Sequence, residues 1–221
     1  MMIGVDPSNT RVERHAMVAS QLRPNAVTDE RIVAAMATIP REAFLPPQAA
    51  GLAYRDRPIP LGSAREINSP LASARLLTAG ELDAADRVLL IGAAGGYTAA
   101  VLAGAVAHVT ALESDPALLA IAREALAALR NVSVVEGPLN EGWVANAAYD
   151  LLVIDGAVEE LPPAIIDQVR PGGRVATGLI ENGVRRLAAG RRTAGGFGLA
   201  SFADIDCVVL PGFSRPQAFR F

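Results

Sequence analysis

A glycine-rich turn and an acidic residue downstream of it are the features of this sequence best suited to chemistry. The turn reads Gly92-Ala93-Ala94-Gly95-Gly96, and Glu113 follows Gly92 by 21 residues. Glycines before a helix let backbone N–H groups approach a ligand closely. A carboxylate offers two acceptor oxygens in one plane, which suits the two hydroxyls of an adenosine ribose. Together the two features favour a cofactor that contains adenosine.

Each feature also has a purely structural interpretation: a tight turn without a ligand, and a solvated glutamate at a strand end. The dinucleotide fingerprint G-x-G-x-x-G requires glycine at two positions that Ala94 and Tyr97 occupy here, so a pyrophosphate is poorly matched. An S-adenosylmethionine site asks less of this turn, because it does not wrap two phosphates. An NAD-dependent oxidoreductase is therefore the weaker alternative.

Predicted strands that alternate with predicted helices position this turn. Five short β-rich runs predict strands, and three helical patterns separate them. The predicted strands are 88–91, 109–112, 132–135, 151–154 and 174–177, and the predicted helices are 97–105, 116–129 and 161–169. This alternation is typical of an α/β fold with a parallel sheet that is buried on both faces. Glycine turns in the region 184–221 predict antiparallel strands at the sheet edge.

Ligands of such a sheet bind at the carboxyl ends of its strands. Gly92 and Glu113 lie at two of these ends, and Asp155 follows the fourth predicted strand. Asp155 is therefore a candidate site residue, with a helix-capping role as its alternative.

The first eighty residues are predicted to be helical and irregular. Helices are expected over 11–22, over 28–39 with Thr28 as the cap, and over 71–79 with Pro70 opening the helix. Prolines make 45–60 extended and rich in turns. A change of composition near residue 80 divides the chain into an N-terminal segment, 1–80, and a Rossmann-like domain, 81–221, which we expect to pack as one unit.

Composition excludes several classes of protein. The 221 residues are 51% hydrophobic and 19% charged, which fits a globular protein with a sizeable core. A net charge of −3 gives no reason to expect a nucleic-acid partner. All 20 basic residues are arginine, which excludes a lysine Schiff base or a P-loop lysine.

The few cysteine and histidine residues exclude further kinds of site. One cysteine, Cys207, excludes an internal disulfide, and two isolated histidines leave no metal site to expect. Cys207 itself is expected to be a buried strand residue. These features favour a reducing, cytoplasmic location, and the first residues do not resemble a secretory signal.

One stretch is long enough to suggest a membrane span. Residues 88–112 contain no Asp, Glu, Lys or Arg. The stretch is nevertheless divided by the glycine turn and contains His108, so we expect a strand, a turn, a helix and a strand instead. No membrane partner is expected.

The N-terminal region carries motifs of greater specificity than the glycine turn. In order along the chain they are Met17-Val18, Gln21-Leu22-Arg23, Thr28-Asp29, Pro40-Arg41-Glu42-Ala43-Phe44-Leu45-Pro46, Ala53-Tyr54, Asp56 and Pro58-Ile59-Pro60-Leu61-Gly62. Further on come Gly92 to Leu102, Asn131 to Trp143 and Pro171-Gly172-Gly173-Arg174. Over nearly its whole length the chain resembles the protein-L-isoaspartate O-methyltransferase family.

The resemblance implies a class I methyltransferase fold, a mostly parallel seven-stranded sheet with helices on both faces. It implies S-adenosyl-L-methionine as the cofactor and methyl transfer to the α-carboxylate of isoaspartyl residues in damaged proteins or peptides. That carboxylate is already ionised at neutral pH, so the reaction needs alignment more than a general base.

The resemblance also implies site residues. Asn68 takes the catalytic position, and the substrate would contact Ile67, Asn68, Ser69 and Pro70. The cofactor would contact Gly92, Ala93, Ala94, Gly96, Glu113, Ser114, Leu139 and Asp155.

Four positions depart from the family pattern. Asn68 replaces the serine of the Ile-Ser-x-Pro motif, Leu90 replaces an acidic residue, and Ala94 replaces a glycine. Pro138 replaces the aspartate of a Gly-Asp-Gly motif that meets the adenine. Each loss would remove on the order of 1–3 kcal/mol of hydrogen bonding to a ligand.

These departures leave three functions open. The chain is expected to be an isoaspartyl methyltransferase. The alternatives are a descendant that lost methyl transfer and acts as a binding or regulatory protein, and a methyltransferase with a different acceptor. Arg65, Glu66 and Asp155 are the side chains that could enter the site in compensation.

Overall fold

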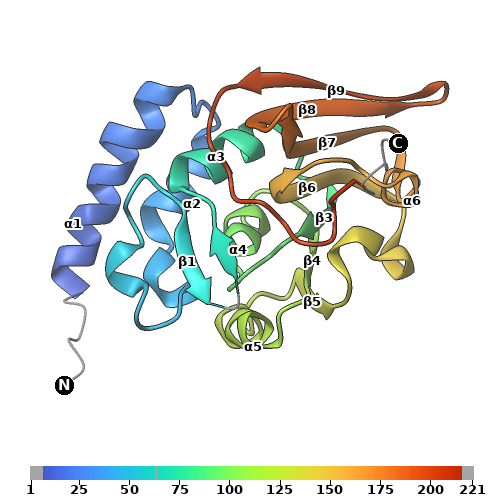
Figure 1. Cartoon of the computed structure of the whole chain (residues 1–221). Coiled ribbons are helices and arrows are strands. Elements are labelled where there is room, and N and C mark those ends of the chain that lie inside the picture. Colours follow the sequence, from blue (N-terminus) through green and yellow to red (C-terminus); the bar gives the residue numbers. More distant parts are fainter. Residues whose placement is uncertain (1–6, 63, 216–221) are drawn as a thin grey trace, which may run out of the picture.

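The computed structural model describes residues 7–62 and 64–215 (Figure 1). A seven-stranded sheet forms its centre, in the order β5-β4-β3-β6-β7-β8-β9. The strands are β3 (Arg87–Ile91), β4 (His108–Glu113), β5 (Val132–Glu136), β6 (Tyr149–Val158), β7 (Val169–Glu181), β8 (Val184–Thr193) and β9 (Gly196–Ala203). β5, β4, β3, β6 and β7 pair in parallel, and β8 and β9 are antiparallel. The predicted fold class is confirmed, including the antiparallel strands at the edge.

Helices surround the sheet, and a small hairpin lies beside it. The helices are α1 (Pro7–Met17), α2 (Glu30–Thr38), α3 (Pro70–Ala79), α4 (Tyr97–Ala103), α5 (Pro116–Ala125) and α6 (Pro163–Ile166). A π-helical turn, η1 (Val18–Leu22), continues α1, and five 3-10 turns follow: η2 (Arg23–Asn25), η3 (Arg41–Phe44), η4 (Ala50–Leu52), η5 (Leu139–Glu141) and η6 (Val144–Asn146). The hairpin joins β1 (Ile59–Gly62) to β2 (Arg65–Ile67).

Side chains at helix starts explain where three of the helices begin. Asp29 caps α2, Ser69 caps α3, and Asp115 caps α5 by accepting from backbone N–H groups. Pro70 and Pro116 occupy the first positions of their helices, where a missing N–H costs nothing. The helix predicted from Pro70 is confirmed, whereas the prediction that Thr28 caps the second helix is wrong by one residue.

The prediction of a long helix over 161–169 is wrong, because β6 and β7 extend further than their apolar runs suggested. α6 is confined to Pro163–Ile166, and β7 already begins at Val169. The helix predicted to end at residue 129 ends at Ala125. Glycines and polar residues within the long strands hid their full length.

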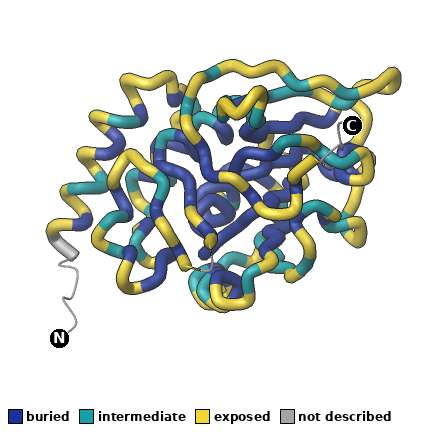
Figure 2. The backbone as a smooth tube through the Cα atoms, viewed as in Figure 1, coloured by how far each residue is buried: buried dark blue, intermediate teal, exposed yellow. Residues whose placement is uncertain are grey.

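Both faces of the central strands are buried (Figure 2). Val88 and Leu90 pack on one face with side chains of α2, α4 and the N-terminal region. Leu89 and Ile91 pack on the other face with α6 and the segment around Leu210. This alternation follows from the two-residue period of a strand. The division at residue 80 stays a prediction.

Residues 88–112 fold as a strand, a turn, a helix and a strand, as expected. Within the described parts of the chain, none of the helices has the length and apolar character that crossing a membrane requires.

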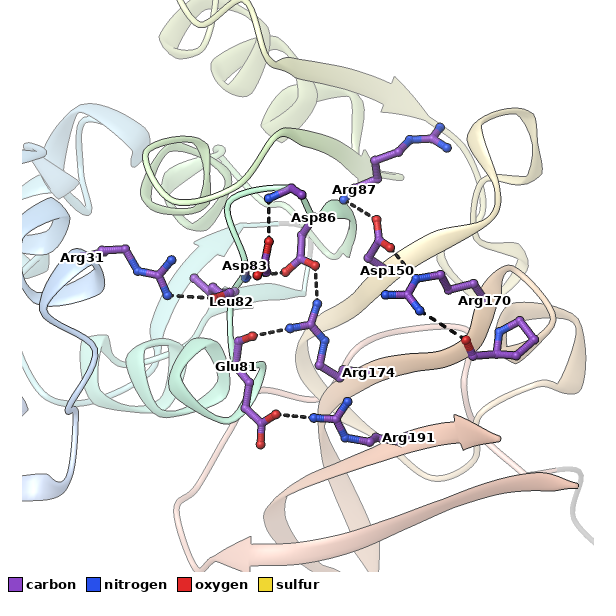
Figure 3. A network of polar contacts seen from close by, with 12 residues as sticks. Arg31, Glu81, Leu82, Asp83, Asp86, Arg87, Asp150, Arg170, Arg174 and Arg191 are labelled. Atoms are coloured by element: carbon purple, nitrogen blue, oxygen red, sulfur yellow. Dashed lines mark hydrogen bonds and ion pairs between the residues drawn. The ribbon is translucent and has the colours of Figure 1, made fainter. Parts of the chain in front are cut away.

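A network of arginines and carboxylates joins the amino ends of the strands to the N-terminal region (Figure 3). Arg174 on β7 pairs with Asp86 and donates to the carbonyl of Glu81. Arg31 on α2 donates to the carbonyl of Leu82 at 2.8 Å. Asp86 is 3% exposed, so its carboxylate depends on the arginine for neutralisation.

We expect Arg174→Met to lower the free energy of unfolding by about 3 kcal/mol, because it leaves the Asp86 carboxylate buried without its partner. The control is Arg191→Met, whose arginine pairs with Glu81 at the surface, and its effect should stay below about 1 kcal/mol. Urea denaturation of the two variants checks this. Equal losses would contradict the assignment of the network's stability to the buried pair.

Candidate functional site

The carboxyl ends of β3, β4 and β6 meet at one edge of the sheet. β3 lies between the other two, so the chain moves to opposite sides of β3 when it forms β4 and then β6. In open α/β sheets, this reversal of direction is where ligands bind. The glycine turn follows β3 here, and Glu113 is the last residue of β4.

The glycine turn adopts the left-handed backbone at three positions. Gly92 has φ +80°, Ala94 φ +49° and Gly96 φ +96°, and α4 begins directly after Gly96. Ala94 is the only one of these three with a Cβ, and an L-residue in this conformation is strained by about 1–2 kcal/mol. The backbone thus still has the shape that a glycine at this position would favour.

The Glu113 carboxylate is fully buried and accepts from two arginine N–H groups and three backbone N–H groups, with the Ser114 hydroxyl a further donor at 3.5 Å. Its Oε1 accepts from Arg65 Nη1 at 2.5 Å and from the backbone N–H groups of Ser114 at 2.7 Å and Asp115 at 3.0 Å. Its Oε2 accepts from Arg65 Nη2 at 3.0 Å and from the N–H of Ala94 at 2.8 Å. A carboxylate has about four lone-pair sites. Glu113 therefore has no acceptor capacity left for two ribose hydroxyls.

The Leu210 side chain packs against two glycines, Gly92 after β3 and Gly156 within β6. A Cβ added to Gly92 would lie 2.8 Å from Leu210 Cδ1, and one added to Gly156 would lie 2.6 Å from Leu210 Cγ. Two backbone hydrogen bonds hold the segment that carries Leu210 to Ala157. The Ala157 N–H donates to the carbonyl of Val208 at 2.6 Å, and the Leu210 N–H donates to the carbonyl of Ala157 at 3.0 Å. The side chain thus lies against the glycine backbones.

Asp155 lies at the centre of a buried polar cluster with Asn68. Its carboxylate accepts from Asn68 Nδ2 at 2.7 Å, from Thr98 Oγ1 at 2.5 Å and from Ser73 Oγ at 3.0 Å. The Asn68 Oδ1 accepts from the N–H of Val208 at 2.8 Å. Both ends of the Asn68 amide are therefore engaged by the protein. Asp155 lies within β6, so the helix-capping interpretation of this residue is wrong.

Arg41 is a charged residue that sequence reasoning did not connect with the site. It is fully buried, lies 4.7 Å from the centre of the Tyr97 ring, and donates from Nη2 to the carbonyl of Asn68 at 2.6 Å. Its Nε and Nη1 have no hydrogen-bond partner among the described residues. Burial lowers the pKa of Arg41 and raises the pKa of Tyr97 to about 12. The signal was present, because Arg41 belongs to one of the N-terminal motifs.

The remaining predicted site residues lie in three different environments. Ile67, Ser69, Pro70 and Ala93 are buried close in sequence to Asn68 or Gly92, and the Ser69 hydroxyl is used to cap α3. Ser114 is exposed and contributes its backbone N–H to Glu113. Leu139 is buried in the apolar cluster of the Leu210 face. The assignment of these residues to substrate and cofactor stays a prediction.

Of the side chains expected to compensate for the departures, two enter the site. Arg65 reaches Glu113, and Asp155 reaches Asn68. Glu66 is exposed on the outer side of β2. Leu90, in the place of an acidic residue, is completely buried in the core.

The arrangement does not fit an adenosyl cofactor as it stands. Glu113, the predicted ribose acceptor, is saturated by Arg65 and backbone N–H groups, and Leu210 lies against Gly92 and Gly156. A ribose on Glu113 would have to replace Arg65. Among the residues described, no group of three or more His, Cys, Asp or Glu side chains is placed to hold a metal ion.

Comparison with known proteins places the chain in a family. The family model described as Protein-L-isoaspartate(D-aspartate) O-methyltransferase matches residues 13–202. The chain belongs to this family.

Curated relatives match the chain nearly from end to end. The chain is 37% identical to Protein-L-isoaspartate O-methyltransferase 1 of Rhodopseudomonas palustris, over 95% of this chain and 87% of the relative. It is 35% identical to the Protein-L-isoaspartate O-methyltransferase of Koribacter versatilis, over 96% of each chain. The resemblance seen in the sequence motifs is thereby confirmed.

Solved structures of protein-L-isoaspartate O-methyltransferases share the fold. One has a TM-score of 0.77 at 23% identity and covers 90% of this chain and 66% of its own. A putative family member from Plasmodium falciparum, in complex with S-adenosyl-L-homocysteine, has a TM-score of 0.72 at 16% identity. The match covers 89% of this chain and 97% of the Plasmodium chain. The isoaspartyl methyltransferase architecture is therefore retained despite the altered crevice.

We expect Ala94→Gly to raise the free energy of unfolding by up to about 1 kcal/mol, because glycine relieves the left-handed strain at this position. Ala93→Gly is the matched control: Ala93 is not left-handed, so this change should lower the free energy of unfolding by about 0.5–1 kcal/mol. Urea denaturation distinguishes them. A loss of stability in Ala94→Gly equal to that of the control would contradict the interpretation of the turn.

Cys207 should be inert in the folded chain. Its side chain is completely buried with Leu76 and Ala157, and burial raises the pKa of its thiol to about 12. At about pH 8 the thiol therefore stays protonated and inaccessible, so dithiobis(nitrobenzoate) should react only after unfolding in guanidinium. Rapid stoichiometric reaction of the folded chain would show that this core region is open.

Proposed function

We propose that the chain transfers the methyl group of S-adenosyl-L-methionine to the α-carboxylate of L-isoaspartyl residues in damaged proteins or peptides. The observation that carries the proposal is family membership over nearly the whole chain. The glycine turn after β3 and the carboxylate at the end of β4 lie where a class I methyltransferase binds its cofactor. A cytoplasmic location, with no nucleic-acid, membrane or metal partner, belongs to the proposal.

The chemistry suits a site without a general base. An α-carboxylate is ionised at neutral pH, so the protein has to align the acceptor and keep water out. We assign the acceptor to the region of Ile67 and Asn68, at the junction of β2 and α3. In the described conformation, the Asn68 amide contacts Asp155 and Val208. An acceptor would have to replace one of these contacts, and the crevice would have to open.

A second candidate is a descendant that kept the fold and lost methyl transfer. The specific observation in its favour is the saturated Glu113 carboxylate beside the Leu210 side chain. The third candidate is a methyltransferase with another acceptor. The polar cluster around Asn68 favours it, because Asn68 replaces the serine of the family's acceptor motif. A methyl-transfer assay and a binding titration together separate the three functions.

A tritiated methyl-transfer assay with an isoaspartyl peptide should give slow but chain-dependent formation of a base-labile ester. The same peptide with ordinary aspartate is the substrate control and should remain unlabelled. Glu113→Gln should lower the rate by at least ~10-fold, because the amide supplies only one of the two acceptor oxygens. Asn68→Ser should raise the rate if the altered motif limits turnover.

If the assay shows no labelling, calorimetric titration with S-adenosylhomocysteine distinguishes the two alternative functions. Binding without labelling of either peptide would reject the isoaspartyl acceptor and favour a different one. Neither binding nor labelling would reject methyl transfer and favour the non-catalytic descendant.

A further inference from the structure

The β1–β2 hairpin delivers Arg65 into the interior. In β2 the burial alternates, with Arg65 and Ile67 inside and Glu66 outside. The hairpin is antiparallel, with Ile59 opposite Ile67 and Gly62 opposite Arg65. The pattern of the strand therefore directs Arg65 inward, where it meets Glu113 at the end of β4, a residue 48 positions further along the chain.

The guanidinium forms the strongest type of contact available to Glu113. Two parallel N–H···O bonds, at 2.5 and 3.0 Å, join the planar groups. Arg65 is 5% exposed and Glu113 is fully buried, so the pair is shielded from solvent. A buried carboxylate without a neutralising partner is costly. The pair thus stabilises the form in which no ligand contacts Glu113.

A nucleoside can replace the hydrogen bonds of the arginine to Glu113 but not its positive charge. Ribose hydroxyls donate hydrogen bonds but carry no positive charge. A ligand that replaces Arg65 must offset both the lost ion pair and the transfer of the guanidinium to a new environment. The Arg65 Nε already has no partner among the described residues. Arg65 therefore competes directly with the ligand that Glu113 is placed to bind.

The elements that close the crevice are mechanically connected. Asn68 follows β2 directly and accepts from the N–H of Val208, two residues before Leu210. Leu210 lies on Gly92 and Gly156. The residue after the hairpin and the segment with Leu210 are thus joined by a hydrogen bond of the Asn68 amide.

We propose that Arg65 is a built-in competitor of the cofactor, which holds Glu113 in a closed crevice and sets the affinity for the adenosyl group. The inference rests on the proposed function, because it takes the crevice to be the cofactor site. Removal of the arginine leaves Glu113 with its three backbone donors. The carboxylate then regains acceptor capacity for ribose hydroxyls.

The test is calorimetric titration of S-adenosylhomocysteine into the full chain and its variants. Arg65→Gln and Arg65→Met should each bind at least ~10-fold more tightly than the unaltered chain. Glu66→Gln, on the outer side of the same strand, is the matched control and should bind as the unaltered chain does. The double variant Arg65→Gln/Glu113→Gln should lose the gain. Circular dichroism establishes that each variant is folded.

The outcomes separate this inference from the proposed function. Unchanged or weaker binding by both folded Arg65 variants, with binding by the unaltered chain, overturns the competitor role and leaves methyl transfer standing. No binding by any folded form at millimolar concentration overturns both.

Chemical modification of the unaltered chain tests the proposal without variants. If the ligand displaces Arg65, saturation with S-adenosylhomocysteine should increase the modification of Arg65 by methylglyoxal, located by peptide mass spectrometry. Arg57 is exposed without ligand and serves as the internal reference. Equal or reduced modification of Arg65 in the presence of ligand overturns the proposal.

Discussion

The ion pair between Arg65 and Glu113 is the constraint on which the rest of the site depends. It joins the N-terminal hairpin to the centre of the sheet through two buried side chains. The same carboxylate holds the backbone of Ala94 in the glycine turn and the start of the segment that leads into α5. One carboxylate thus organises the hairpin, the turn and a helix start. The structure that surrounds it is a methyltransferase fold in which an arginine already binds the predicted ribose acceptor.

The two edges of the sheet use charge in different ways. At the amino ends of the strands, Arg174 and its neighbours connect the strands to the loop before β3 (Figure 3). At the carboxyl ends, Arg65 donates to Glu113, and Asn68 donates to Asp155. The first edge supports the fold. The second edge combines the family architecture with buried polar contacts at the predicted cofactor residues.

The sequence predicted much of this structure because local chemistry and tertiary packing agree. Short apolar runs identified the parallel strands, and Pro70 marked the start of α3. The prediction failed for the helix over 161–169, where long-range pairing of β6 and β7 extends strands through residues of weak β-propensity. Glu113 and Asp155 were identified from strand ends. The sequence raised Arg65 only as a side chain that could enter the site and did not predict its pairing with Glu113, because nothing local specifies which side chain a hairpin delivers to a distant strand.

The most direct test of the closed crevice is the position of the Arg65 guanidinium in crystals of the full chain, grown without ligand and soaked with S-adenosylhomocysteine. Without ligand, this account predicts the guanidinium on both oxygens of Glu113 and Leu210 against Gly92. In soaked crystals it predicts a ribose on Glu113 with Arg65 displaced. A ligand-free crevice that is open, with Arg65 directed into solvent, would contradict the account.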